Sequence, residues 1–391
     1  MRKRWLLIPT FMIALALGLL VGVRAALAQD GGGGGDDGGR SSFDQKCLAC
    51  HGDSTASTTF ENGDTLGVAV DVTMLDDSVH GLSNPQSGLS CYDCHGEYPF
   101  PHQATYASAR DFRLQLTQAC EYCHTYEGGL QHDSVHADAM AAGNENAAVC
   151  VDCHGSHNIS HPDDPRSRIP QTCGQCHTEI YAQYKESVHG AALLDDANPD
   201  VPSCIDCHGV HNIGDPTTNL FRLRSPDLCA KCHANAPLME KYGISTNVFN
   251  SYVSDFHGRT VELFLQEAPG AAVNKAVCYD CHGVHDILPP TDPRSSVAPA
   301  NLLHTCQRCH PDASQGFDEA WTKHYEPSRD KFPVVYYVDL FYKLFIPGIL
   351  GFFGVVMVPD IIRRIVSAMR GDDHSGHGTS GGGHSGTASE E

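Results

Sequence analysis

Every cysteine of the chain belongs to one short unit, Cys-x-x-Cys-His. The 391 residues contain 18 cysteines and 24 histidines, and the unit occurs nine times. Its cysteine pairs are Cys47 and Cys50, Cys91 and Cys94, Cys120 and Cys123, Cys150 and Cys153, Cys173 and Cys176, Cys204 and Cys207, Cys229 and Cys232, Cys278 and Cys281, and Cys306 and Cys309. The histidines that complete the units are His51, His95, His124, His154, His177, His208, His233, His282 and His310. No cysteine is left over, so this unit governs what the chain can fold into.

The spacing inside the unit has a chemical reason. Cys-x-x-Cys-His is the attachment motif of c-type haem. Two cysteines one helical turn apart can both form thioethers with the vinyl groups of one porphyrin, and the histidine on the same face reaches the iron. A zinc knuckle, a redox-active dithiol or disulfides would be reasonable for a single motif. Nine complete units favour haem, and the sequence therefore predicts nine covalently bound haem c groups with these histidines as proximal iron ligands.

The units alternate in type and define a repeat. Every second unit reads Cys-x-Asp-Cys-His-Gly, and these even units begin at Cys91, Cys150, Cys204 and Cys278. Further histidines recur between the units at similar places, and they are the candidates for the distal iron ligands. They are His80, His102, His136, His157, His189, His211, His257, His285 and His324. Four full copies of the repeat start at Cys47, Cys120, Cys173 and Cys229, and a half copy extends from Cys306 to His324.

Equal numbers of proximal and candidate distal histidines fit bis-histidine iron throughout. Such an iron has no open position for a substrate. We therefore expect an electron-transfer protein, or a subunit of an oxidoreductase complex, and assign no catalytic residue. His132 or His304 could replace one of the nine distal candidates. The alternative is a multihaem reductase of a nitrogen or sulfur oxyanion with one high-spin haem, although no altered attachment motif marks such a haem.

Chain length limits which histidines can share an iron. His154 and His157 are three residues apart, so their Cα atoms lie at most about 10–11 Å apart. Ligands on opposite sides of one iron need Cα atoms roughly 12–13 Å apart, given metal–nitrogen bonds of about 2 Å. His157 should therefore serve a neighbouring haem, and the same holds for His211 and His285. His102 lies seven residues after His95, so the first copy departs from this rule.

The rest of the chain suggests export and a membrane anchor. Residues 1–28 read as a signal peptide, with a basic start, an apolar stretch and a small-residue cleavage site. Residues 29–42 form a Gly-rich linker and 43–326 the nine-haem domain. An apolar stretch at 333–362 is long enough for one transmembrane helix, with a buried soluble helix as the alternative. Residues 363–391 are a basic stretch and a Gly/Ser/His tail, which we expect to be cytoplasmic and, in the tail, disordered.

Composition bears on the fold class and on partners. Gly and Pro number 38 and 22, which is unfavourable for a conventional core, so something besides side chains must fill the interior. We expect a mainly irregular fold with short α-helices wrapped around stacked covalent haems. Helical spacing appears at 178–188 and 261–267, and no convincing strands are seen. Without the signal, 22 basic and 47 acidic residues give 22 − 47 = −25, which argues against nucleic acid as a partner.

The alternating Cys-x-x-Cys-His and Cys-x-Asp-Cys-His-Gly-x-His units resemble the doubled-CxxCH and tetrahaem-cytochrome-like families of multihaem cytochromes c. The resemblance covers about residues 43–326. It implies a loop-rich fold around stacked haem pairs. Members of these families serve as electron carriers, as quinol-dehydrogenase subunits and as reductases. We expect the haem domain on the extracytoplasmic, periplasmic side of the cell membrane. Expected partners are a membrane quinol-oxidising or cytochrome b-type subunit and extracytoplasmic redox proteins.

Overall fold

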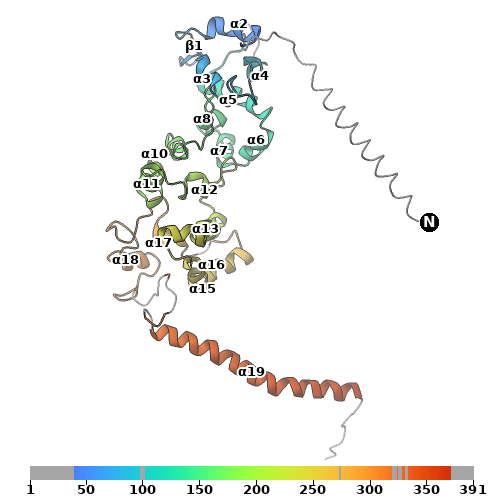
Figure 1. Ribbon diagram of the computed structural model, residues 1–391, viewed down its shortest axis with the longest axis vertical. Coiled ribbons are helices and arrows are strands. Elements are labelled where there is room, and N and C mark those ends of the chain that lie inside the picture. The colour runs from blue at the N-terminus through green and yellow to red at the C-terminus, as the bar shows by residue number, and fades with distance from the viewer. Residues whose placement is uncertain are drawn as a thin grey trace, which may run out of the picture. The chain divides into compact units, whose positions relative to one another are not determined.

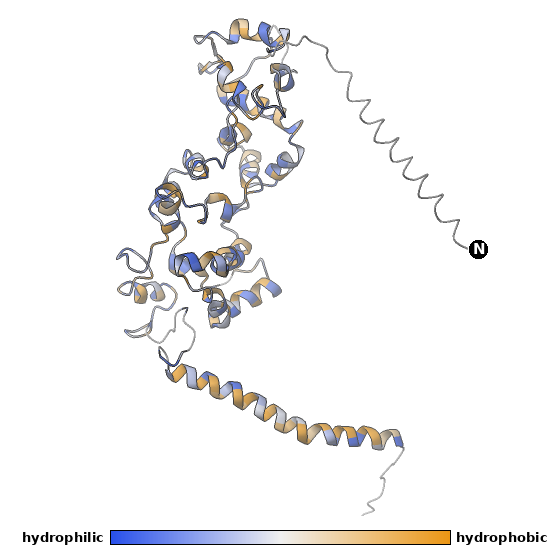
Figure 2. Ribbon diagram, viewed as in Figure 1, coloured by the Kyte–Doolittle hydropathy of each residue, from blue (hydrophilic) through white to orange (hydrophobic). Residues whose placement is uncertain are grey.

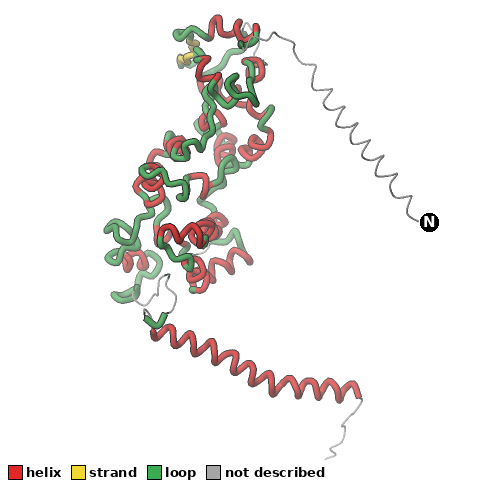
Figure 3. Tube along the Cα trace, viewed as in Figure 1, coloured by secondary structure: helices red, strands yellow, loops and turns green. Residues whose placement is uncertain are grey.

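The computed structural model consists of short helices joined by long loops (Figures 1 and 3). It describes residues 39–96, 102–272, 274–318, 324, 328–330 and 333–370. The predicted signal peptide, most of the predicted linker and the tail after Arg370 lie outside these residues. Within the described part the short helices, the small amount of sheet and one long apolar C-terminal helix agree with the expected fold class.

The helices of the body are mostly only two or three turns long. In chain order they are α2 (Ser42–His51), α3 (Val72–Asp76), α4 (Cys91–His95), α5 (Ala109–Glu121), α6 (Thr125–His132), α7 (Val135–Ala141), α8 (Cys150–His154), α9 (Arg168–Gly174), α10 (Thr178–Glu186), α11 (Val188–Leu194), α12 (Cys204–His208), α13 (Asn219–His233), α14 (Ala236–Met239), the 3-10 helix η1 (Glu240–Tyr242), α15 (Val248–Ser254), α16 (Phe256–Glu267), α17 (Cys278–His282) and α18 (Leu302–Gln307). The predicted helices at 178–188 and 261–267 correspond to α10 and to the second half of α16.

One small sheet corrects the expectation of no strands. β1 (Ser57–Thr59) pairs antiparallel with β2 (Thr65–Gly67), and Thr58 lies opposite Leu66. Gly63 in the connecting loop has φ +88°, a conformation that glycine adopts without strain. The strands have only three residues each, too few for an alternating pattern to stand out in the sequence.

The chain divides into two compact units, which we treat separately. Unit 1 comprises residues 1–222 and 283–289, and unit 2 comprises 223–282 and 290–391. Apolar packing is sparse in both. The core cluster of unit 2 consists of three buried residues, Leu223, Val261 and Val277, with Phe264, Leu265 and Tyr279 against them. Helices this short are only marginally stable by themselves. Something besides their side chains must therefore supply the apolar surface against which they pack.

The long helix α19 (Pro333–Arg370) is of a different kind. It is apolar along most of its length (Figure 2), and its most apolar window has mean hydropathy 2.0 with none of its residues buried. A core helix of a soluble protein would be mostly buried, so its length and exposure support a membrane span. The helix continues past the predicted end at residue 362 and includes Arg363, Arg364 and Arg370. Near its start Lys343 pairs with Asp339 at 2.7 Å, as their i, i+4 spacing predicts.

Candidate haem-binding sites

The aspartate of each even unit caps the short helix that carries the unit. These helices are α4, α8, α12 and α17, and the aspartate is their third residue. Its carboxylate accepts a hydrogen bond from the backbone N–H just before the first cysteine. The donor–acceptor distances are 2.7 Å for Ser90 and Asp93, 2.9 Å for Val149 and Asp152, 2.7 Å for Ser203 and Asp206, and 2.7 Å for Val277 and Asp280. The Asp of the motif thus holds both cysteines and the histidine on one helical turn.

The glycine after the even-unit histidine turns the chain away from that histidine. Gly155, Gly209 and Gly283 have φ of +74°, +83° and +86°, values that a residue with a Cβ adopts only with strain. Gly96 of the first copy is instead right-handed, with φ −57°. This difference accompanies the unusual position of His102 in the first copy.

Three of the four histidines between an odd and an even unit, His136, His189 and His257, sit at the starts of helices. A residue two positions earlier provides the cap. The Ser134 Oγ accepts from the Ala137 N–H at 3.2 Å, and the Ser187 Oγ accepts from the Gly190 N–H at 3.0 Å. The Asp255 carboxylate takes the same role before His257, accepting from its N–H at 2.8 Å. At these three positions the capped helix start fixes the imidazole, whereas His80 lies in a turn after α3.

The structure brings proximal and distal candidates together in pairs. Eight pairs lie among the described residues, with ring-centre distances between 6.0 and 6.3 Å. They are His51 with His102, His124 with His80, His95 with His157, His177 with His136, His154 with His211, His208 with His285, His310 with His257, and His282 with His324. One metal ion bound to a nitrogen of each ring at about 2 Å separates the ring centres by roughly 6 Å. The paired residues therefore fit an iron with two imidazole ligands.

The pairs follow the exchange that the chain-length argument predicts. His157 lies against His95 and not against His154, and His211 in turn lies against His154. Each histidine that follows an even unit after the first copy thus faces the even unit of the preceding copy. His189 lies in compact unit 1 and His233 in compact unit 2. Both stay predicted ligands.

Backbone hydrogen bonds join the same neighbouring copies. The N–H of Val79 donates to the carbonyl of Ile159 at 2.8 Å, and the N–H of Val135 donates to that of Ile213 at 2.9 Å. In each case the valine precedes a distal candidate of one copy, and the isoleucine closes the His-Asn-Ile sequence of the next. Val188 and Ile287 repeat the contact at 2.9 Å. The valine before each distal candidate and the isoleucine after the even unit of the next copy are both visible in the sequence. That they form a hydrogen bond with each other is a long-range contact that the sequence alone does not reveal.

Burial favours the neutral, ligating form of these imidazoles. It lowers the pKa of His95, and the neighbouring His157 lowers it further. Burial likewise lowers the pKa of His154, His208 and His282, because the protonated form loses its hydration. In two rings Nδ1 has a hydrogen-bond partner. His51 Nδ1 lies 2.7 Å from the Val68 carbonyl oxygen, and His324 Nδ1 lies 3.2 Å from the Ser251 Oγ. Nε2 is then the nitrogen left for a metal.

The attachment cysteines form a series in chain order within each unit of the fold. The first cysteines of an odd unit and of the next even unit are hydrogen-bonded, as in Cys120 with Cys150 and Cys173 with Cys204. Cys229 and Cys278 repeat this in unit 2. Thiols of successive copies are also close enough to interact electrostatically, for example Cys153 with Cys173. Groups attached to these sulfurs would therefore be close neighbours.

The alternatives for the cysteines find no support in the structure. All 18 cysteines are free thiols within the described residues. The same residues contain no cluster of three or more His, Cys, Asp or Glu side chains that could hold a metal ion. A zinc knuckle would need four such ligands around one point. Two histidines with ring centres 6.0–6.3 Å apart, one of them next in sequence to a pair of cysteines, instead match the ligands of a covalently attached haem.

Two arginines that the sequence did not single out brace the even units. Arg110 Nη1 donates to both oxygens of Asp152 at 3.0 and 2.8 Å, and Arg166 binds Asp206 at 2.5 Å. Their spacing from the motif is irregular, so no local signal could have identified them. His132, a possible substitute ligand, contacts Glu121 at 3.1 Å and takes part in none of the eight pairs.

Comparison with known proteins agrees with this picture. Residues 142–234, which contain the units starting at Cys150, Cys173, Cys204 and Cys229, match the family model described as Cytochrome c3. The chain is 25% identical over 195 residues to the multiheme cytochrome MtrA of Shewanella baltica, covering 48% of the chain and 52% of MtrA. It is 24% identical over 147 residues to the cytochrome c-type protein NrfB of Escherichia coli O6:H1, covering 33% of the chain and 74% of NrfB. The chain thus spans about half the length of MtrA.

No solved structure matches the chain. The family model and the two relatives support a multihaem c-type cytochrome with covalently bound haem c.

Proposed function

We propose that the chain is a membrane-anchored nonahaem cytochrome c. It transfers electrons between a membrane quinol-oxidising or cytochrome b-type partner and extracytoplasmic redox acceptors. The eight histidine pairs at 6.0–6.3 Å carry this proposal. They leave both axial faces of the iron closed, which suits electron transfer and disfavours substrate binding. His189 and His233 are the ninth distal and ninth proximal candidates.

The residues that would hold each haem supply only position and environment. The two cysteines would hold the porphyrin, and the proximal and distal histidines would bind its iron. The distal histidine comes from a neighbouring copy in each described pair except His51 with His102. Iron supplies the one-electron chemistry when the haem is bound. Because attachment thiols adjoin in chain order, haems 1–6 form one conducting series in unit 1 and haems 7–9 a second in unit 2.

The membrane side of the proposal rests on α19. The half repeat starting at Cys306 ends just before this helix, so the ninth haem is the one nearest the membrane partner along the chain. Arg363, Arg364 and Arg370 follow the apolar segment and favour a cytoplasmic C-terminus by the positive-inside rule. The haem domain is then periplasmic, in agreement with the predicted signal peptide.

Two measurements on the detergent-purified protein test the cofactor content. A pyridine haemochrome assay against intact mass should give nine haems per chain, and a smaller number would contradict the count. Electron paramagnetic resonance of the oxidised protein should show low-spin ferric haem only. A high-spin signal equivalent to about one haem would favour the reductase.

The need for a membrane partner is tested with the same preparation. The purified chain alone should oxidise a quinol analogue slowly. Oxidation at the full rate without any other subunit would contradict this part of the proposal.

A further inference from the structure

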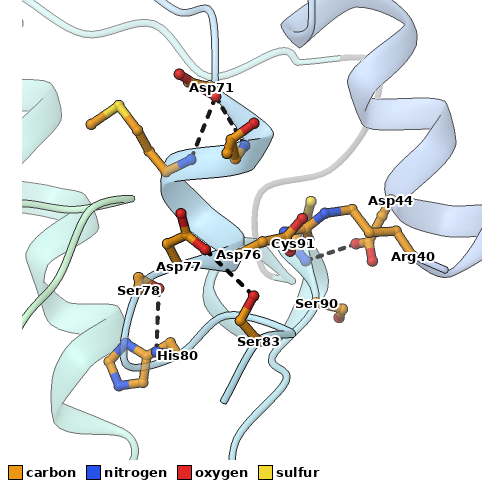
Figure 4. A network of polar contacts seen from close by, with 12 residues as sticks. Arg40, Asp44, Asp71, Asp76, Asp77, Ser78, His80, Ser83, Ser90 and Cys91 are labelled. Atoms are coloured by element: carbon orange, nitrogen blue, oxygen red, sulfur yellow. Dashed lines mark hydrogen bonds and ion pairs between the residues drawn. The ribbon is translucent and has the colours of Figure 1, made fainter. Parts of the chain in front are cut away.

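Arg40, just before the first helix, is a buried cation with an incomplete set of partners. Its side chain is 7% exposed, and it forms an ion pair through Nη2 with Asp76. Its Nε and Nη1 are buried and have no hydrogen-bond partner in the structure. Figure 4 shows the side chain extending past Asp44 toward Asp76, with Cys91 beside it. A guanidinium buried in this way leaves donors unsatisfied, which costs free energy.

Arg110 shows what a completed site of this kind looks like. It also lies against an even attachment unit, but each of its nitrogens has an acceptor. Nε donates to the Glu145 carbonyl at 2.7 Å, Nη2 to the Ala147 carbonyl at 2.6 Å, and Nη1 to Asp152. Arg40 is more deeply buried than Arg110, whose side chain is 21% exposed, yet lacks two of these contacts. The residues that the structure describes therefore leave two donors of Arg40 open to a further acceptor.

The surroundings of Arg40 narrow the nature of that acceptor. The guanidinium is close enough to Cys91 to lower the pKa of its thiol, against the dominant effect of burial. Cys47 adjoins Cys91, and Cys94 of the same unit adjoins Cys123. The attachment points of the first two haems thus lie near this arginine, and that of the third adjoins the second. Each haem carries two propionate carboxylates, which a guanidinium fork binds in bidentate fashion.

We propose that a propionate carboxylate of one of the first three haems accepts a hydrogen bond from Arg40 Nη1, one of its two donors without a described partner, while Nη2 holds Asp76. The inference rests on the proposed haem attachment and goes beyond it by giving Arg40 a role as a positioning residue. Arg40 neutralises the propionate and ties it to α3, which leads through Ser78 to the distal candidate His80. A positive charge held there also favours the reduced state of the adjacent haem.

The test uses the full-length haem-loaded protein, with the carboxyl carbons of its haems labelled with carbon-13 by feeding labelled aminolevulinate. Redox-induced infrared difference spectra then separate propionate bands from those of Asp76, which carries no label. Arg40→Met should shift a labelled carboxylate band and lower the midpoint potential of one haem. Arg294→Met is the control, since it removes an arginine whose side chain is 60% exposed and paired with Asp292, and it should leave the labelled bands unchanged.

The outcomes distinguish this inference from the proposed function. If wild-type protein contains no covalent haem, the proposed function fails. If haem content is complete but the labelled bands of Arg40→Met coincide with those of wild type, the Arg40 inference alone is overturned, and solvent fills the site. Should Arg40→Met fail to accumulate, Arg40→Lys replaces it. The lysine keeps the charge but not the fork, so a smaller shift of the same labelled band is expected and an unchanged band is again contradictory.

Discussion

The first copy of the repeat and the later copies use the histidine after their even unit in opposite ways. In the first copy this histidine is His102, and its ring lies against His51 of the same copy. In the third copy it is His211, and its ring lies against His154 of the preceding copy. The histidine after the even unit is therefore exchanged between copies from the second copy on, whereas in the first copy it stays within its own copy.

The comparison shows how a chain with little apolar core can gain cooperativity. In repeat proteins, stability arises largely from the interfaces between neighbouring copies, and terminal copies differ because they have one neighbour. Here the interface combines an exchanged imidazole with the Val–Ile backbone bond. The first copy shares this interface with the second through His80 and His95, but it keeps its own His102. Substitutions of the exchanged histidines should therefore have the largest effects.

Replacing His211 by methionine should change the haem of the preceding copy and not that of its own. Methionine in place of an axial imidazole raises a haem potential, by on the order of a tenth of a volt within the wide range that axial ligands span. We expect one haem in a redox titration of His211→Met to move upward. Adding Cys150→Ser and Cys153→Ser, which remove the haem beside His154, should abolish the shift.

The first copy provides the matched control. The upward shift of His102→Met should disappear when Cys47 and Cys50 are replaced by serine, since His102 faces the first attachment unit. Exchange between copies would be wrong if the His211→Met shift vanished on removal of Cys204 and Cys207 instead.

The glycine that turns the chain should matter only where the exchange occurs. Gly209 has φ +83°, and a Cβ there would meet nothing closer than 3.4 Å, so Gly209→Ala is penalised by backbone strain rather than by collision. We expect it to lower stability by about 1–2 kcal/mol, seen as earlier loss of Soret circular dichroism on heating. Gly214→Ala in the same loop is the control, because its Cβ would meet no atom within 4 Å and its φ is unrestricted. Equal effects of the two substitutions would argue against a required left-handed turn.

The sequence predicted the chemistry of this molecule better than its architecture. The cysteine units and recurrent histidines follow from local spacing, because covalent attachment demands fixed distances along the chain. That His157 cannot face His154 also follows from chain length alone. His157 faces His95 instead. The choice of this distant partner depends on how the intervening loops fold.

The remaining features required three-dimensional contacts. The hairpin of β1 and β2 is too short to show alternation. Arg40 lies in a segment whose composition reads as the end of a linker, yet its side chain is buried. Burial of an arginine depends on Asp76, a residue 36 positions away, and no local pattern announces such a pair.

The smallest effect we predict concerns how the first copy holds its even unit. Asp44 is 2% exposed and accepts a hydrogen bond from the Cys91 N–H at 2.8 Å; Thr117 occupies the corresponding position of the second copy. Burial raises the pKa of Asp44, but hydrogen bonds from Cys91 and Ser41 outweigh it and bring the pKa below its usual 3.8. The ionised carboxylate therefore contributes stability above about pH 4, and this contribution is lost as the pH falls through the lowered folded-state pKa.

Asp44→Asn should accordingly lower the stability of the haem-loaded protein by about 1 kcal/mol near neutral pH. The difference from wild type should shrink in acid, because protonation removes the same charge from the wild-type side chain. Thermal unfolding at a series of pH values measures both effects. Glu61→Gln, at an exposed carboxylate of the same copy, should leave the profile unchanged. A wild-type advantage that stays constant down to pH 3 would mean that Asp44 acts through shape and not through its charge.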